Sequence, residues 1–156
     1  MERKILVAVD DSENALRAVR FIGEHFSPDH SITLFSVIPD TAAICDMNSP
    51  SLTPYFLAQK GAFCTVEEQK KELVSKALEK AKKDLIEAGF EEKKIAIKME
   101  TQNKGIARDI IDTARSNYDV VVLGRRGLSG VKEFFLGSVS QKVLHAAQDL
   151  SVLLVD

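Results

Sequence analysis

Short runs of apolar residues recur along the chain, and longer amphipathic segments separate them. Residues 4–10 are nearly continuous in apolar side chains, as strands covered on both faces are. Similar runs occupy residues 32–38, 94–101, 119–123 and 151–155. We therefore expect five β-strands.

The segments between these runs carry apolar residues three or four positions apart, the spacing of amphipathic helices. Ser12 is a good N-cap for the first helix, which is expected to end at Phe26, before Pro28. Residues 105–116 and 138–147 show the same spacing. A further helix is expected from a capping box at residues 65–68 to about residue 88, where Gly89 ends it.

Strict alternation of strands and helices predicts an α/β fold with a parallel sheet and right-handed crossovers. We expect a single domain over residues 1–156, built as an open five-stranded Rossmann-like sheet of order 3-2-1-4-5, sandwiched by four helices. Ligands in such sheets bind beyond the carboxyl ends of the strands, where the winding direction reverses. That point lies between the first and fourth strands.

Residues 40–64 show no clear period and contain Pro50, Pro54 and Gly61. Loops of this length in compact domains are usually functional or mobile. We therefore expect a loop that is mobile without ligand and lies near the proposed pocket, because it starts where the second strand ends.

Composition excludes several classes of function. The net charge of −2 provides no basic field for nucleic acid or a membrane surface, and no apolar run is long enough to cross a membrane. The N-terminal residues lead directly into a strand, so no secretory signal is expected. Cys45 and Cys64 are expected to be reduced thiols of a cytoplasmic protein, and the scattered histidines predict no metal site made of protein ligands alone.

The strongest candidate for chemistry follows the fourth strand. Gly124-Arg125-Arg126-Gly127 is followed nine residues later by Gly137-Ser138-Val139-Ser140, which opens the last helix. Glycines permit close backbone approach, and a helix start presents free amides to an anion. The pattern predicts a phosphate site that is not a P-loop, because no lysine follows Gly137-Ser138. The alternative is that these glycines only turn the chain.

Asp10 ends the first strand and so lies at the same switch point as Gly124. Its carboxylate is suited to accept a hydrogen bond from a ribose hydroxyl, or to orient water on a nucleotide-bound metal ion. The alternative is a helix-capping carboxylate, a role for which Asp11 and Ser12 compete.

These residues resemble the universal stress protein family over essentially the whole chain. The resemblance rests on residues 5–12 (Ile-Leu-Val-Ala-Val-Asp-Asp-Ser), the G-x-x-G-x9-G-S pattern and the short apolar last strand. It implies the ATP-binding branch of the family, with ATP, ADP or AMP as ligand and Mg²⁺ or Mn²⁺ held through the phosphates. The nucleotide-binding residues expected on this basis are Ala8, Val9, Asp10, Val37, Leu123, Gly124, Arg126, Gly127, Gly137, Ser138, Val139 and Ser140.

The chain departs from many relatives in having Arg125-Arg126 between the first two glycines and Asp149-Leu150 before the last strand. The resemblance also implies a homodimer, and the apolar strand Ser151–Val155 at the sheet edge is the expected interface.

Three functional classes remain open. The first is an ATP-binding stress or signalling module with slow or no hydrolysis. The second is a true ATPase, and the third is a dimeric interaction module with a vestigial site. Efficient hydrolysis needs a group that positions water, and the loop between Gly124 and Gly137 offers only Glu133 for that task. The first class is therefore favoured.

Overall fold

The computed structural model describes residues 1–10, 13–47, 51, 53–125 and 137–156. Its strands form one parallel sheet in the order β3-β2-β1-β4-β5, which confirms the predicted order. The elements are β1 Lys4–Ala8, α1 Glu13–His25, β2 Ser31–Ile38, α2 Ala42–Cys45, α3 Pro54–Glu87, a 3₁₀ turn Glu92–Lys94, β3 Ile95–Thr101, α4 Ile106–Asn117, β4 Val120–Gly124, α5 Ser138–Ala146 and β5 Ser151–Val155.

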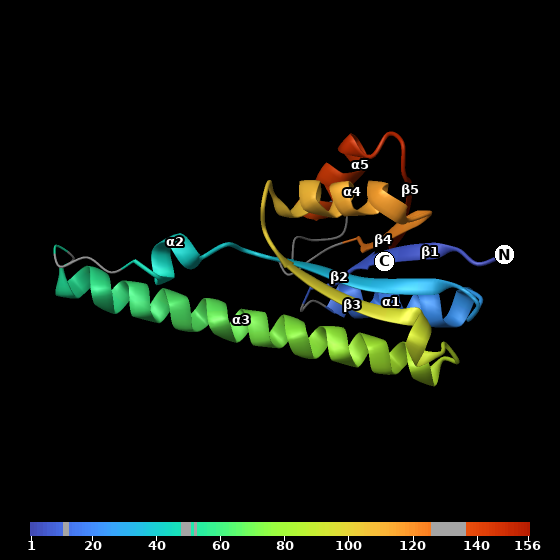
Figure 1. Cartoon of the computed structure of the whole chain (residues 1–156), viewed down its shortest axis with the longest axis horizontal. Coiled ribbons are helices and arrows are strands. Elements are labelled where there is room, and N and C mark those ends of the chain that lie inside the picture. The colour runs from blue at the N-terminus through green and yellow to red at the C-terminus, as the bar shows by residue number, and fades with distance from the viewer. Residues whose placement is uncertain (11–12, 48–50, 52, 126–136) are drawn as a thin grey trace.

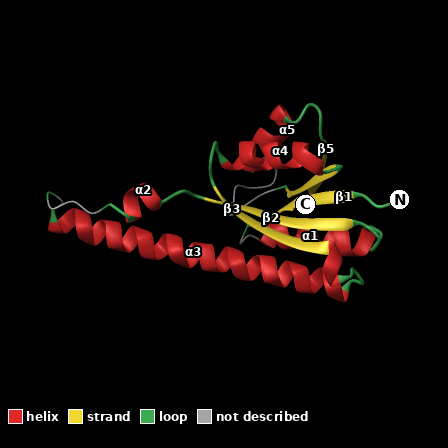
Figure 2. Ribbon diagram, in the orientation of Figure 1, coloured by secondary structure: helices red, strands yellow, loops and turns green. Residues whose placement is uncertain are grey.

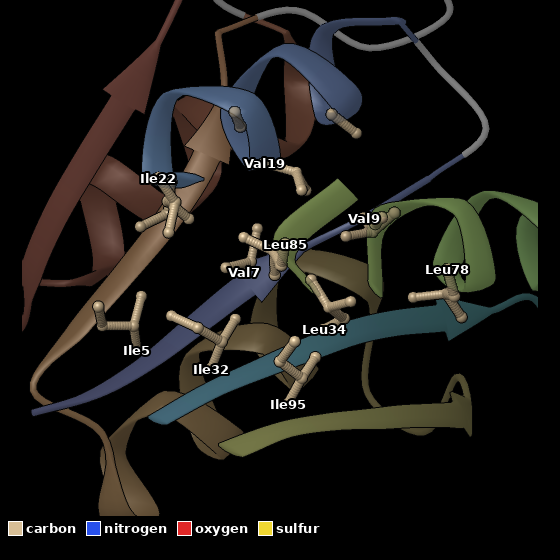
Figure 3. Packing of buried hydrophobic residues seen from close by; sticks show 14 of the residues in the cluster. Ile5, Val7, Val9, Val19, Ile22, Ile32, Leu34, Leu78, Leu85 and Ile95 are labelled. Carbon is tan, nitrogen blue, oxygen red and sulfur yellow. The ribbon is translucent and has the colours of Figure 1, made fainter. Parts of the chain in front are cut away.

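Helices cover both faces of the sheet (Figures 1 and 2). On one face, Ile5 and Val7 of β1 pack with residues of α1 and α3 such as Ile22 and Leu85 (Figure 3). On the other face, Leu6 packs with residues of α4 and α5. Successive β1 side chains therefore enter opposite cores, which explains the unbroken apolar run in the sequence.

Helix α3 is much longer than the sequence pattern predicted. It begins at Pro54, so the expectation of a loop over residues 40–64 and of a helix start at Thr65 is wrong. Thr53 is the actual N-cap and its side chain accepts a hydrogen bond from the Phe56 amide. Pro54 occupies the first helical turn, where a missing amide costs nothing, and the Thr65 hydroxyl donates to the Gly61 carbonyl inside the helix. Pro54 and Gly61, taken as loop signals, and Thr65, taken as a helix start, therefore all belong to one helix.

Helix α2 is an additional element, and a disulfide attaches it to α3. Cys45 and Cys64 are bonded, with 5.8 Å between their Cα atoms. The expectation that both are reduced thiols is therefore wrong. The sequence alone does not determine the distance in space between these two cysteines. The helical path of residues 54–64 brings them together.

The end of α3 lies close to its predicted position. Gly89 adopts a φ of 106°, its amide donates to the Ile86 carbonyl, and the Phe90 amide donates to the Leu85 carbonyl. This is a Schellman motif, in which a residue without Cβ is strongly favoured. It directs the chain into β3, whose Ile95 enters the core beside Phe90.

Within the described ranges, no helix is both long enough and apolar enough to cross a membrane.

Candidate functional site

The carboxyl ends of β1 and β4 lie side by side at the point where the sheet reverses its winding. Val7 pairs with Val122, so Ala8, Val9 and Asp10 continue past β1 next to the end of β4. The Val9 amide donates a 2.8 Å hydrogen bond to the Phe35 carbonyl of β2, which holds the segment after β1 against the sheet. Val9 is buried and Asp10 is partly exposed. The structure thus brings the two strand ends together as the sequence predicted.

Gly124 ends β4 in close contact with helix α1. A Cβ at this position would lie 2.9 Å from both the carbonyl carbon and the carbonyl oxygen of Asn14. Such distances are well inside van der Waals contact with backbone, which has little freedom to move. Gly124 therefore has a packing role of its own, because it lets the first turn of α1 approach the end of β4.

Two hydrogen bonds fix the start of α5 beside Gly124. The hydroxyl of Ser140 is buried and donates to the Gly124 carbonyl at 2.8 Å. The Gly137 amide donates to the Arg125 carbonyl at 2.9 Å, and the Arg125 amide donates to the Val155 carbonyl of β5 at 2.7 Å. The N-terminus of α5 is thereby attached to the ends of both β4 and β5.

The first turn of α5 carries the backbone amides that the sequence analysis expected to face an anion. Gly137 is the N-cap, with φ −56° and no side-chain capping bond, so the amides of Ser138, Val139 and Ser140 lie in the turn that lacks partners inside the helix. These amides and the helix dipole favour a negative charge. Ser138 is exposed, whereas the Ser140 hydroxyl is already committed to Gly124. A phosphate at this turn therefore depends on backbone amides and Ser138 rather than on the Ser140 side chain.

Four apolar residues of the predicted set belong to the core on the α4–α5 side of the sheet, whereas Val9 belongs to the core on the α1–α3 side. Leu123 is buried in the core on the α4–α5 side, and Ala8, Val37 and Val139 pack against that core. Val37 follows Phe35, the partner of Ala8, by two positions along β2, so it lies on the same face beyond the end of β1. Ala8 and Val37 thus form an apolar surface on this face at the strand ends.

Part of the predicted site lies outside the described residues. This applies to Arg126 and Gly127 of the glycine pattern, to Glu133, and to Asp11 and Ser12 after β1. The other predicted residues lie in four segments. Residues 8–10, 123–124 and 137–140 meet at the β1–β4 junction. Val37 lies beside them on β2.

Sequence reasoning missed a buried carboxylate at the same edge of the sheet. Asp109 of α4 accepts hydrogen bonds from the Asn103 amide at 2.8 Å and the Lys104 amide at 3.0 Å. Burial alone would raise the pKa of Asp109, but these amides and that of Gly105 outweigh it and lower the pKa below its ordinary value. The carboxylate thus fixes the turn after β3. An aspartate four positions after Gly105 was the available signal in the sequence.

A cavity of about 350 Å³ was also not foreseen. It lies where β2 and β3 end, between α2 and α3. The disulfide forms part of its wall, as do Asp40, Asp46, Glu67 and Lys71. Its lining includes residues that the sequence analysis assigned to an unstructured loop.

Doubly wound parallel sheets with a helix N-terminus at the switch point form a class of α/β proteins that bind ligands at this edge. Comparison with known proteins identifies the family within this class. The model of the universal stress protein family matches residues 1–156. This chain belongs to the universal stress protein family.

Two curated relatives illustrate the sequence similarity. A universal stress protein from Synechocystis sp. is 35% identical over 158 residues, covering 97% of this chain and 96% of the relative. Another from Mycolicibacterium smegmatis is 32% identical over 147 residues, and the match covers 94% of this chain but 46% of the relative. The chain therefore spans about half the length of that second protein.

Solved structures show the same fold. UspA from Lactobacillus plantarum aligns with a TM-score of 0.68 at 20% identity, covering 99% of this chain and 97% of that one. A family member from Arabidopsis thaliana with AMP bound aligns with a TM-score of 0.63 at 20% identity, covering 98% and 90%. A universal stress protein in complex with cAMP gives 0.62 at 19% identity, covering 98% and 95%.

Proposed function

We propose that this chain binds an adenine nucleotide at the carboxyl ends of β1 and β4 and acts as a nucleotide-dependent module in stress response or signalling. The observation that carries the proposal is the bond from Ser140 to Gly124, which holds the start of α5 at the switch point of the sheet. A helix N-terminus fixed in this place presents its amides to an anion. The structures of family members with AMP and with cAMP support an adenine nucleotide as the ligand.

In this proposal the phosphates lie at the first turn of α5, against the amides of Ser138 and Val139 and the Ser138 hydroxyl. The nucleoside lies along Ala8, Val9 and Asp10, with Val37 behind the base. Asp10 accepts a hydrogen bond from the ribose. Mg²⁺ or Mn²⁺ is held by the nucleotide phosphates. We propose ATP as the preferred nucleotide, because its triphosphate offers the most oxygens to the amides of α5 and the Ser138 hydroxyl.

Calorimetric titration of the purified chain with ATP, ADP, AMP and cAMP, each with and without Mg²⁺, tests the proposal. Gly137→Val is the informative variant. The φ of −56° is accessible to any residue, so the substitution does not strain the backbone. A loss of nucleotide binding in this variant would therefore indicate that the phosphate lies close to the backbone of residue 137. Gly61→Val in the exposed arm of α3 is the matched control, since a Cβ there meets nothing within 4 Å. Absence of binding by the wild-type chain at millimolar nucleotide would refute the proposal.

Hydrolysis is proposed to be slow, because efficient phosphoryl transfer needs a water-positioning residue and a charge clamp at the γ-phosphate. We expect turnover well below the roughly 1 s⁻¹ lower end of dedicated enzymes. Phosphate release measured with saturating Mg-ATP tests this point. A rate above that value, abolished by Gly137→Val, would instead identify an ATPase.

We also propose a homodimer through β5. The two edge strands of the sheet are β3 and β5. Strand β3 carries a Lys98–Glu100 ion pair of 3.0 Å, and charged side chains on an edge strand discourage pairing with another strand. The β5 edge, Ser151–Val155, has no charged residue. Antiparallel pairing of two β5 strands about a two-fold axis would satisfy both edges.

A further inference from the structure

The first half of α3 extends beyond the sheet as an arm (Figures 1 and 2). All buried residues of this helix (Ala77, Leu78, Ala81 and Leu85) lie in its second half. We call residues 54–75 of α3 the arm. Helix α2 lies alongside it and is attached by the disulfide to Cys64, with a further hydrogen bond from the Lys60 ammonium to the Met47 carbonyl. One side of the arm is therefore occupied within the chain.

Another side of the arm carries an exposed apolar stripe. Its members are Phe56, Phe63, Val66 and Leu73, with 40%, 41%, 47% and 50% of their surface exposed. They are separated by seven, three and seven positions. This is the spacing of the contact positions of a helix that packs along another helix. Large apolar side chains aligned in this way on a projecting helix indicate a protein contact.

The spacing of seven, three and seven positions is the same in both directions along the helix. The stripe of a second copy that runs antiparallel can therefore lie against this stripe with each apolar residue opposite another. In that alignment Phe56 lies opposite Leu73 of the second copy, and Phe63 opposite Val66. The two-fold axis passes between Cys64 and Thr65. We propose that the arms of two chains pair in this antiparallel register, and that the occupant of the stripe is a second copy of this chain.

The two polar positions inside the stripe also match in this register. Gln59 lies opposite Lys70 of the second copy. The Gln59 amide nitrogen donates to the Tyr55 hydroxyl at 2.6 Å, which leaves its carboxamide oxygen to accept a hydrogen bond from the ammonium of that lysine. In a parallel pair, Lys70 would instead face its own copy, and like charges at such positions repel. Polar positions of this kind set register and orientation in paired helices.

Charges next to the stripe are already used within the chain. The Lys60 ammonium donates to the Met47 carbonyl of the α2 segment. The Glu67 carboxylate pairs with Lys70 at 3.3 Å and faces the cavity beside α2, with 16% of its side chain exposed. The proposed register therefore depends on the stripe and on Gln59 and Lys70.

The length of the arm fits the proposed overlap. Residue Pro54, at the helix start, lies opposite Ser75 of the second copy, next to Val74, which is the first residue of α3 that packs against the core. The overlap of residues 54–75 is about 33 Å at 1.5 Å per residue. Each arm would thus end where the body of the other chain begins, with the two bodies at opposite ends.

Sedimentation velocity over a range of protein concentration tests the pairing. The full chain is used in a Leu153→Lys background, which removes any contribution of the β5 edge. We expect concentration-dependent dimers that Phe63→Glu weakens by about 100-fold, because it places two carboxylates in an apolar contact. Glu72→Gln is the control, since Glu72 lies outside the stripe with an exposed side chain, and it should leave association unchanged. Monomers at all concentrations up to about 100 µM in this background would overturn the proposal.

A charge exchange tests the register. Gln59→Lys should weaken association by about fivefold, because each dimer gains two lysine–lysine contacts. Adding Lys70→Glu should restore it, since the introduced lysine of one chain then faces the introduced glutamate of the other. Residues 59 and 70 are about three helical turns apart on one chain, so the rescue can only act between chains. In parallel arms both variants would carry two like-charge contacts, so a double variant that associates no more tightly than Gln59→Lys alone would overturn the proposed register.

Discussion

The buried hydroxyl of Ser140 donates a 2.8 Å hydrogen bond to the carbonyl oxygen of Gly124, and this contact joins the last helix to the end of β4. Both residues belong to the glycine–serine pattern that predicted a phosphate site. The structure gives them a packing role at the rim of that site. The phosphate donors of the proposal are consequently the neighbouring amides and Ser138.

Ser140→Ala should lower stability, because it leaves the Gly124 carbonyl without its hydroxyl donor in a buried position. The expected loss is about 1–2 kcal/mol, measured by urea unfolding. Ser138→Ala is the matched control, since Ser138 is exposed and two positions away on the same helix. It should leave stability unchanged and weaken nucleotide binding. If both variants unfold at the same urea concentration as the wild type, the structural role of Ser140 is wrong.

Gly124→Ala should destabilise the fold whether or not nucleotide is present. The added Cβ would lie 2.9 Å from backbone atoms of Asn14, so α1 or β4 must shift. Overpacking of this kind costs about 1–3 kcal/mol. Thermal unfolding without ligand measures the effect, with Gly61→Ala as the control at an open position. An unchanged melting temperature for Gly124→Ala would show that the contact with Asn14 is not tight.

The five strands, their parallel pairing and the end of α3 at Gly89 were predictable because each depends on local pattern: apolar runs, alternation with helices and a terminating glycine. The order 3-2-1-4-5 does not follow from that pattern, but it is a common order of doubly wound sheets. The contact between Gly124 and Asn14 was not, because it joins segments far apart in the chain. The glycine pattern in the sequence indicated that Gly124 matters. It did not show whether the position must lack a Cβ because a ligand lies close by or because helix α1 does.

The arm was missed for a different reason. Pro54 and Gly61 are frequent in loops, yet Pro54 fits the first turn of a helix, and a single glycine inside a helix costs only about 1 kcal/mol. Whether Cys45 and Cys64 bond depends on the distance between α2 and α3, which follows from that helical path. One wrong boundary therefore led to a second wrong prediction about the thiols.

Reduction of the Cys45–Cys64 disulfide should release α2 from the arm. Four residues are too few to form a stable helix alone, so residues 42–47 should lose their protection from hydrogen exchange. In the chain-entropy model, closing a loop of this size contributes about 3 kcal/mol to stability. Exchange measured with and without a reductant tests this, and a Cys45→Ser/Cys64→Ser variant should be insensitive to the reductant. Equal exchange in the oxidised and reduced wild type would contradict the prediction.

Asp109 should contribute stability at neutral pH that disappears in acid. Its pKa is lowered in the folded state, so the stabilisation is present above the ordinary aspartate pKa of about 3.9 and is lost as pH falls through the lower folded value. Asp109→Asn removes the charge. The difference in unfolding free energy between wild type and variant should be largest near about pH 7 and shrink towards about pH 2. Asp112→Asn, on the exposed side of the same helix, is the control. A difference that stays constant over this range would be inconsistent with a titrating Asp109.

Leu153→Lys should weaken the proposed β5 dimer. Val152, Leu153 and Leu154 are each partly exposed at the sheet edge, and pairing of two copies would cover them. A lysine at position 153 would then be buried without a partner, which is costly for a charged side chain. Light scattering of the wild type, of Leu153→Lys and of a matched edge variant on the opposite side of the sheet, Met99→Lys in β3, separates the two edges. We expect Leu153→Lys, and not Met99→Lys, to shift the β5 dimer towards monomer when arm pairing is also blocked. Because the arm of α3 is a separate surface, the comparison is made in a Phe63→Glu background, where a wild-type β5 edge that yields only monomers at micromolar concentration would refute the dimer.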